Sequence, residues 1–238
     1  EGFRALRSNL NFFNPDSKKK IYLVTSSISG EGKTYIAQNL AIVFAKSGKK
    51  TLVLGADLRR PRMYVDFELT NDIGVSSHVL GDKSLSDVIV QSDIENLDIL
   101  VSGPMPNNPS DALLNDKFGK MIDTLKEKYE IIILDTPPLG LVADALTLME
   151  YSDINLYVAR QDYSRKGLLS YADDLYVKER LGDTYLIFND VKEGSGAYGY
   201  GYGYGYGYGY GYGYGYGNKY GYAQGSEYFD DNEKLKKV

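Results

Sequence analysis

Apolar and polar positions along this chain predict strands and helices in alternation. Short apolar runs, bounded by turn residues or charges, predict strands at 21–24, 51–54, 96–101, 131–134, 154–159 and 185–188. Apolar residues at helical spacing predict helices at 36–45, 110–128 and 166–181, with a further helix between Asp144 and Asp153. Strands alternating with helices are typical of a parallel sheet covered on both faces. We therefore predict an α/β fold with a mostly parallel, doubly wound sheet.

Three further regions complete the pattern. Residues 1–13 are expected to form an amphipathic helix with apolar residues at Phe3, Leu6, Leu10 and Phe13. The region 63–96 is expected to contain short helices and loops. From Gly194 onward the composition changes abruptly to glycine and tyrosine. We expect three parts, namely an N-terminal helix (1–16), an α/β domain (17–193) and a tyrosine-rich tail (194–238).

A glycine-rich turn joins the first predicted strand to the helix at 36–45, and it reads Ser26-Ser27-Ile28-Ser29-Gly30-Glu31-Gly32-Lys33-Thr34. Its glycines let successive N–H groups point into one concavity at a helix N-terminus, where phosphate oxygens bind. In such a P-loop, Lys33 reaches the β- and γ-phosphates and the Thr34 hydroxyl ligates Mg²⁺. Ser27 stands where the usual pattern has its first glycine, and the alternative is a glycine turn without a ligand. The predicted nucleotide-binding residues are Ser29, Gly30, Glu31, Gly32, Lys33, Thr34 and Tyr35.

Two aspartates follow predicted strands at the edge where parallel sheets bind ligands. Asp57 comes shortly after the strand at 51–54, and Asp135 directly after the strand at 131–134. Taken alone, Asp57 is readable as a helix N-cap and Asp135 as a turn residue. Next to a P-loop, we predict that Asp135 is a Walker B residue that holds Mg²⁺. Asp57 is predicted to bind Mg²⁺ or to accept a proton from an incoming hydroxyl.

Charged residues in the predicted N-terminal helix follow a regular step. Glu1, Arg4 and Arg7 are three residues apart and so lie along one face. Periodicity alone favours a solvated face with an i,i+3 ion pair. His78, the one histidine of the chain, has no metal-ligand spacing around it and is expected to be a surface or packing residue.

The tail carries a strict Tyr-Gly alternation from Tyr198 to Gly217, without a charged residue. Glycine makes ordering costly and the segment has no aliphatic core, so a flexible tail is expected. One interpretation is a low-complexity segment that stacks or associates. The other is a series of phenols, each of which its glycine neighbours allow to enter a narrow site.

The amino-acid composition restricts the partners and the chemistry that this chain is expected to have. The formal net charge of −5 argues against binding to nucleic acid or to an anionic membrane surface. The chain has no cysteine, which excludes disulfides and thiolate chemistry. No apolar run approaches the roughly 20 residues that span a bilayer. Because the first residue is Glu1, the sequence leaves open whether an anchoring segment precedes it.

Together these features resemble the bacterial tyrosine kinases of capsule and exopolysaccharide export, over essentially the whole chain. Five segments of this chain are similar to motifs of that family, in chain order. They are Glu1, Arg4 and Arg7 (the E-x-x-R-x-x-R motif), Gly30–Thr34 (Walker A), Leu54–Arg59 (D-x-D-x-R), Leu134–Pro138 (Walker B) and the tail (the tyrosine cluster). Any one of these segments is a weak signal, but their occurrence in this order is specific.

One position departs from the family pattern. Gly55 replaces the first aspartate of D-x-D, which leaves Asp57 as the only carboxylate of that pair. The missing function then falls to Asp57, to Asp135 or to water. Since Gly55 ends a predicted strand, we expect its side-chain position to face the ligand. Gly55→Asp is therefore expected to be tolerated and to change the rate or the metal preference.

The resemblance implies an ATP-dependent protein-tyrosine autokinase with ATP and Mg²⁺ as cofactors. It implies that Lys33, Asp57 and Asp135 are catalytic and that Thr34, Asp57 and Asp135 hold Mg²⁺. The adenine end of the nucleotide is expected near Asn189. The implied acceptors in the tail are Tyr198, Tyr200, Tyr202, Tyr204, Tyr206, Tyr208, Tyr210, Tyr212, Tyr214, Tyr216, Tyr220, Tyr222 and Tyr228.

The resemblance also implies partners and a location. Glu1, Arg4 and Arg7 are expected to assemble the chain into a homo-oligomeric ring, with an octamer as the candidate, in which tails are phosphorylated in trans. The implied partners are a membrane protein that controls polysaccharide chain length, fused or separate, and a tyrosine phosphatase; nucleic acid is not expected. The implied location is the cytoplasmic face of the inner or plasma membrane, with the chain itself soluble.

Two alternatives from other functional classes remain open. One is an ATPase switch like the related partitioning and cell-division ATPases (MinD and ParA), with no tyrosine as acceptor. The other is a binding module whose tail recruits a partner by stacking. Added phosphate on the protein indicates a kinase, and free phosphate without added mass indicates an ATPase.

Overall fold

The computed structural model of this 238-residue chain describes residues 1–12, 20–140, 144–178 and 181–192. Glu1–Val191 forms one compact unit. The tail with its candidate acceptor tyrosines lies outside the described residues, as do the expected domain boundaries after residues 16 and 193.

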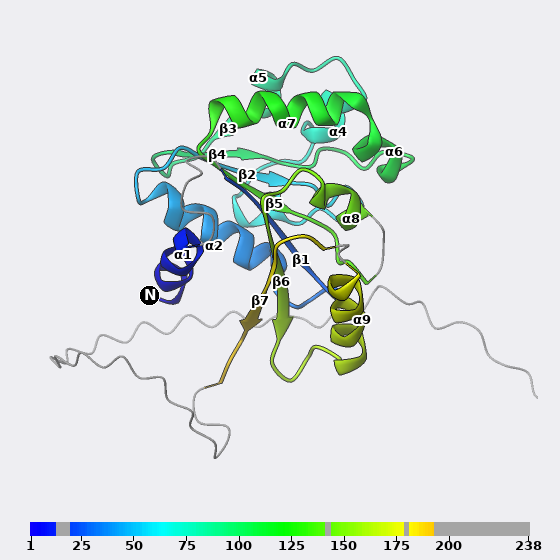
Figure 1. The fold of residues 1–238 in the computed structure, drawn as a ribbon. Coiled ribbons are helices and arrows are strands. Elements are labelled where there is room, and N and C mark those ends of the chain that lie inside the picture. Colours follow the sequence, from blue (N-terminus) through cyan, green and yellow to red (C-terminus); the bar gives the residue numbers. More distant parts are fainter. Residues whose placement is uncertain (13–19, 141–143, 179–180, 193–238) are drawn as a thin grey trace, which may run out of the picture. The chain divides into compact units, whose positions relative to one another are not determined.

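A seven-stranded sheet lies at the centre of this unit, with the strand order β3-β4-β2-β5-β1-β6-β7 (Figure 1). The strands are β1 (Lys20–Ser26), β2 (Thr51–Gly55), β3 (Val90–Gln91), β4 (Leu97–Leu100), β5 (Ile131–Asp135), β6 (Ile154–Arg160) and β7 (Thr184–Asn189). Neighbouring strands are parallel except for β3 and β4. The predicted mostly parallel α/β sheet is therefore confirmed.

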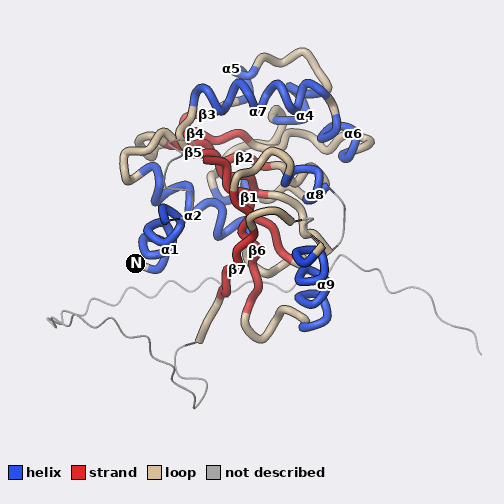
Figure 2. Tube along the Cα trace, in the orientation of Figure 1, coloured by secondary structure: helices blue, strands red, loops and turns tan. Residues whose placement is uncertain are grey.

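Helices cover both faces of the sheet, which Figure 2 separates from the strands by colour. One face packs against α1 (Gly2–Phe12), α2 (Lys33–Ala45) and α3 (Met63–Asp66). The other face packs against α4 (Val75–Val79), α5 (Leu85–Val88), α6 (Pro109–Leu114), α7 (Asp116–Lys128), α8 (Asp144–Met149) and α9 (Lys166–Val177). Within β1, Tyr22 and Val24 belong to the first core and Ile21 and Leu23 to the second, because successive side chains point to opposite faces.

Several expected boundaries are wrong. The single helix expected at 110–128 is two helices, since Asn115 is extended and its side chain accepts the N–H of Lys117 at 2.9 Å. The helix expected at 166–181 ends at Val177. The helix expected between Asp144 and Asp153 is confirmed, and it ends at Met149.

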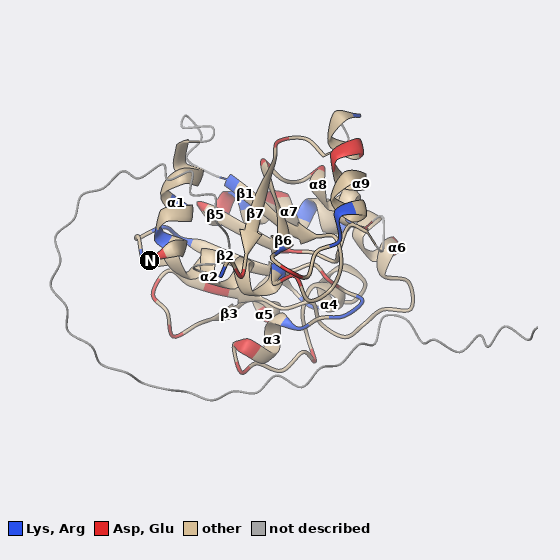
Figure 3. Cartoon of the chain, turned by 90° about the horizontal axis from the view of Figure 1, so that it is seen from below, with Lys and Arg blue, Asp and Glu red and all other residues tan. Residues whose placement is uncertain are grey.

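Two observations concern membrane-spanning helices and the distribution of charge. In the described ranges, no helix is long and apolar enough to cross a membrane. Residues of both charge signs are spread over the helices and loops of the compact unit (Figure 3).

The register of the central strands positions the functional residues. Val24 of β1 and Gly55 of β2 both pair with Asp135 of β5. The carboxyl ends of these three strands are therefore level, and the segments that follow them meet at one edge of the sheet.

Candidate active site

The P-loop joins β1 to α2 and depends on two glycines. Gly30 has φ +88° and Gly32 has φ +95°, a left-handed conformation that disfavours other residues. The α2 helix begins at Lys33, so the loop amides lie at a helix N-terminus, which attracts anions. The glycine turn therefore has the conformation and the context of a phosphate site.

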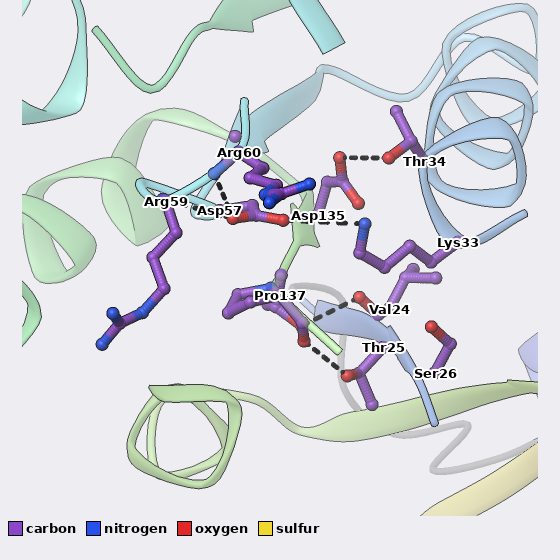
Figure 4. A network of polar contacts seen from close by, with 12 residues as sticks. Val24, Thr25, Ser26, Lys33, Thr34, Asp57, Arg59, Arg60, Asp135 and Pro137 are labelled. Atoms are coloured by element: carbon purple, nitrogen blue, oxygen red, sulfur yellow. Dashed lines mark hydrogen bonds and ion pairs between the residues drawn. The ribbon is translucent and has the colours of Figure 1, made fainter. Parts of the chain in front are cut away.

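Lys33 and Asp57 face each other across this site (Figure 4). Their Nζ and Oδ2 atoms are 3.6 Å apart, and the side chains are 13% and 5% exposed. The other oxygen of Asp57, Oδ1, accepts the N–H groups of Arg59 at 3.3 Å and Arg60 at 3.0 Å. Asp57 thus caps a turn rather than a helix, and it keeps one carboxylate oxygen toward Lys33.

Asp135 lies beside Thr34 at the end of β5. The Thr34 hydroxyl donates to Asp135 Oδ2 at 2.8 Å (Figure 4). Asp135 Oδ1 is buried and has no hydrogen-bond partner among the described residues. Burial raises the pKa of Asp135 from its ordinary value of 3.8 to about 6, although the Lys33 ammonium opposes this shift.

This donor set fits Mg²⁺ held together with a nucleotide. In the described part of the chain, no group of three or more His, Cys, Asp or Glu could hold a metal ion. Mg²⁺ commonly takes only one or two carboxylates and completes its octahedral shell with phosphate oxygens and water. The unpartnered Asp135 Oδ1 and the Thr34 hydroxyl supply oxygens of that kind.

Position 55 does not have the expected free space. A Cβ added to Gly55 would lie 2.8 Å from Ser102 Oγ, 3.2 Å from Ser102 N and 3.3 Å from Met63 Cε. The Ser102 hydroxyl hydrogen-bonds the carbonyl oxygens of Gly55 at 2.9 Å and Asp57 at 3.2 Å. The expectation that a side chain here faces the ligand is therefore wrong. Glycine allows β2 to approach the segment after β4.

Residues distant in sequence support the P-loop, and no local motif indicates them. The Ser27 and Tyr157 hydroxyl oxygens are 2.6 Å apart. The buried Glu31 carboxylate accepts the Ile28 N–H at 2.8 Å and the Ser164 hydroxyl. Glu31, predicted to bind nucleotide, thus directs its side chain to the protein, which leaves its main-chain N–H as the group for phosphate.

A second polar cluster anchors the turn after Asp57. Arg59 Nε donates to Asp144 Oδ2 at 2.7 Å, and Arg59 Nη2 donates to the Ser110 hydroxyl at 2.9 Å. Ser110 in turn donates to Asp144 Oδ1 at 2.7 Å. The Arg59 side chain points away from Lys33 and Asp135 (Figure 4). This arginine therefore ties the turn to α6 and α8.

The charged residues of α1 lie by the C-terminal end of α2, whereas the P-loop precedes the N-terminal end. Arg7 Nη1 donates to the Val43 carbonyl at 2.9 Å. A pocket of about 360 Å³ is lined by Arg4, Arg7, Val43, Lys46 and Ser47. In the described part of the chain, Glu1 forms no ion pair with either arginine. The structure therefore does not contain the i,i+3 pair.

Tyr35 and Asn189 extend the candidate nucleotide site on two sides. The exposed Tyr35 ring packs edge-on against Phe3 of α1, with centroids 5.6 Å apart. Asn189 Nδ2 donates to the Glu31 carbonyl at 3.0 Å, so this residue adjoins the P-loop itself. His78 lies outside this group, with Nδ1 2.8 Å from the Lys83 carbonyl.

Comparison with known proteins finds tyrosine-protein kinases among the similar sequences. A family model described as an AAA domain matches residues 19–180. The tyrosine-protein kinase YwqD of Bacillus subtilis (strain 168) is 37% identical over 166 residues, which cover 70% of each chain. The tyrosine-protein kinase CpsD of Streptococcus agalactiae serotype III (strain NEM316) is 35% identical over 202 residues, which cover 84% of this chain and 85% of CpsD. CapB of Staphylococcus aureus is 38% identical over 145 residues, which cover 61% of this chain and 64% of CapB.

Solved structures agree with these relatives. The kinase domain of Escherichia coli tyrosine kinase ETK has a TM-score of 0.76 and 31% identity, over 85% of this chain and 80% of that one. The chimerical protein CapA2B2 has a TM-score of 0.71 and 36% identity, over 77% and 82% of the two chains. The septum site-determining protein MinD of Pyrococcus horikoshii OT3, at 24% identity and a TM-score of 0.59 over 71% and 70%, shares the fold alone.

Proposed function

Because this chain belongs to the bacterial tyrosine kinases, we propose that it transfers the γ-phosphoryl group of ATP to tyrosine hydroxyls of its own C-terminal tail. The observation that carries the proposal is the convergence of Lys33, Thr34, Asp57 and Asp135 beyond the carboxyl ends of neighbouring strands. Phosphoryl transfer depends mainly on positioning and on charge stabilisation, which such a cluster supplies.

Each side chain has a distinct task in this proposal. The amides from Gly30 to Tyr35 bind the phosphates with Lys33, and Asn189 lies toward the adenine end. Thr34, Asp57 and Asp135 would hold Mg²⁺, which neutralises charge on the phosphoryl group when bound. The phenolic oxygen attacks the γ-phosphorus in line, the bond to the β–γ bridging oxygen breaks, and ADP leaves. Asp57 orients the phenol or accepts its proton.

We further propose that the reaction occurs in trans between subunits. Glu1, Arg4 and Arg7 belong to a subunit interface, and the arginine-lined pocket at the end of α2 supports this role because it is separate from Lys33. The chain is organised as an interface helix, a kinase domain and an acceptor tail, in a ring for which an octamer is the candidate.

We also propose a partner at the membrane. The likeness of this chain to the chimerical protein CapA2B2 supports a second, CapA-like protein as partner. We propose that this partner is the membrane protein that controls polysaccharide chain length. In this proposal the kinase acts at the cytoplasmic face of the membrane and regulates capsular or exopolysaccharide synthesis and export, and a tyrosine phosphatase removes the phosphates.

Intact mass measurement after incubation with Mg-ATP tests the proposal. We expect added phosphates on wild-type protein and none on Lys33→Met, because one preorganised electrostatic contact is worth about a hundredfold or more in rate. Peptide mapping is expected to assign the phosphates to the tail. Release of free phosphate without added mass would instead support the ATPase switch, and neither signal would support the binding module.

A further inference from the structure

Three successive carbonyl groups of the P-loop each accept a hydrogen bond from a distant side chain. The Tyr163 hydroxyl donates to the Ser29 carbonyl at 2.9 Å. Arg160 Nη1 donates to the Gly30 carbonyl at 3.0 Å, and Asn189 Nδ2 donates to the Glu31 carbonyl at 3.0 Å. The donors come from the end of β6, the turn after it and the end of β7, 130 to 158 positions away from their acceptors.

These bonds determine where the loop amides point. In a planar trans peptide the carbonyl of one residue and the N–H of the next point in opposite directions. The three donors hold the carbonyls of residues 29–31 on their own side of the loop. The N–H groups of Gly30, Glu31 and Gly32 therefore point to the opposite side of the loop. In the described part of the chain no acceptor takes these three N–H groups. Successive amides that converge in this way form an anion site.

The glycines and the donors are matched to each other. A Cβ on Gly30 would lie 2.6 Å from the Tyr163 hydroxyl, and a Cβ on Gly32 would lie 2.2 Å from Asn189 Nδ2. The glycines thus make room for the donors. The donors in turn restrict peptide groups that glycine would otherwise leave free to rotate.

The donors also support one another. The Arg160 guanidinium lies 5.3 Å from the centre of the Tyr163 ring, and Arg160 Nε pairs with Asp190 Oδ2 at 3.0 Å. Because Asp190 directly follows Asn189, this pair links the donor at the end of β6 to the donor at the end of β7.

We propose that Tyr163, Arg160 and Asn189 are positioning residues that preset the P-loop amides for the β- and γ-phosphates of the nucleotide. This inference rests on the proposed function, since it concerns the same phosphate site. The three side chains act through the main chain of residues 29–31, and their loss lets peptide groups turn their N–H away from the phosphates.

Tyr163→Phe tests this inference because it removes only the hydroxyl. The matched control is Tyr171→Phe in α9. Tyr171 is 47% exposed, close to the 45% of Tyr163, and its hydroxyl makes no hydrogen bond to the P-loop within the described chain. For each variant we would measure the unfolding midpoint without nucleotide, the increase of that midpoint with Mg-ADP, and the dissociation constant of Mg-ADP.

We expect Tyr163→Phe to unfold near the wild-type midpoint without nucleotide. It should bind Mg-ADP about three- to tenfold more weakly, the typical effect of one hydrogen bond, with a smaller midpoint increase. Tyr171→Phe should match wild type in all three measurements. If Tyr163→Phe binds Mg-ADP with wild-type affinity, or if Tyr171→Phe loses as much affinity as Tyr163→Phe does, this inference is wrong while the proposed function stands. Wild-type protein that does not bind Mg-ADP would overturn the proposed function as well.

Discussion

The two oxygens of the Asp135 carboxylate have different surroundings, which is the main electrostatic feature of the site at the scale of single residues. Oδ2 accepts the Thr34 hydroxyl, whereas Oδ1 is buried without a partner among the described residues. A buried carboxylate oxygen without a partner destabilises the ionised form. The nucleotide-free protein therefore keeps this buried, unpartnered carboxylate oxygen at some cost to its own stability.

We predict that Asp135→Asn stabilises the nucleotide-free protein at pH 7 and has little effect near pH 4. The folded-state pKa of about 6 exceeds the ordinary 3.8, so the folded protein binds this proton more tightly than the unfolded chain does. The resulting contribution to stability is present below pH 4 and is lost as the pH rises to 6, which gives about 1–3 kcal/mol. Denaturant unfolding in EDTA at both pH values measures this difference. A variant less stable than wild type at pH 7 would contradict the prediction.

Gly55 is needed for close packing, so we predict that Gly55→Ala destabilises the protein by about 1–3 kcal/mol, as overpacking does. Gly55→Asp should cost more, because its carboxylate would be forced against Ser102 and Met63. Gly167→Ala is the control, since a Cβ there has nothing within 4 Å. Thermal unfolding compares the three variants, and a Gly55→Asp protein as stable as wild type would restore the original expectation for this position.

At the scale of elements, α1 contacts α2 near both of its ends. Phe3 packs against Tyr35 next to the P-loop, and Arg7 binds the Val43 carbonyl near the other end. The 13 residues of α2 span about 20 Å at 1.5 Å per residue. The arginine pocket and the phosphate site are thus held on one rigid element but are well separated.

We predict that the double variant Arg4→Ala, Arg7→Ala is monomeric and still binds ATP, while tail phosphorylation falls. The arginines belong to the proposed interface, whereas Lys33 and Asp57 are at the opposite end of α2. Light scattering and nucleotide titration measure the two properties. The double variant Lys120→Ala, Lys126→Ala on α7 removes the same charge and should assemble normally. Tail phosphorylation at the wild-type rate in a monomer, independent of concentration, would argue against transfer in trans.

At the scale of the whole molecule, phosphorylation of the tail would change the net charge of the chain. The segment from Tyr198 to Gly217 has ten tyrosines and no charged residue, and the chain has a formal charge of −5. Each phosphate adds about −1.5 to −2 charges at neutral pH, so ten add on the order of −15 to −20. This added charge would exceed the original charge, and it would be repeated on every subunit of the proposed oligomer.

We predict that progressive phosphorylation of the tail disassembles the oligomer, and that it does so earlier at low salt. Salt screens charge repulsion over about 8 Å at physiological ionic strength and so weakens the effect. Sedimentation before and after incubation with Mg-ATP, at two salt concentrations, measures the change, with Lys33→Met as the unphosphorylated control. If the oligomer stays intact at low salt with a fully phosphorylated tail, the tail is a substrate but has no role in disassembly.

The sequence by itself determined the features that depend on neighbouring residues. Apolar periodicity predicted the parallel α/β sheet, and the turn before Lys33 predicted a P-loop between a strand and a helix. The aspartates after two predicted strands had to reach one edge, because parallel strands end on the same side. Each of these inferences needs only local patterns and the geometry of a parallel sheet.

Only the tertiary structure decided which distant groups fill the space around that edge. Ser102 and Met63 occupy the space next to Gly55. Tyr163 and Asn189 reach the P-loop carbonyls from positions more than a hundred residues away. The physical reason is that periodicity records which face of an element is buried, whereas the contacts of a side chain depend on how separate elements pack together.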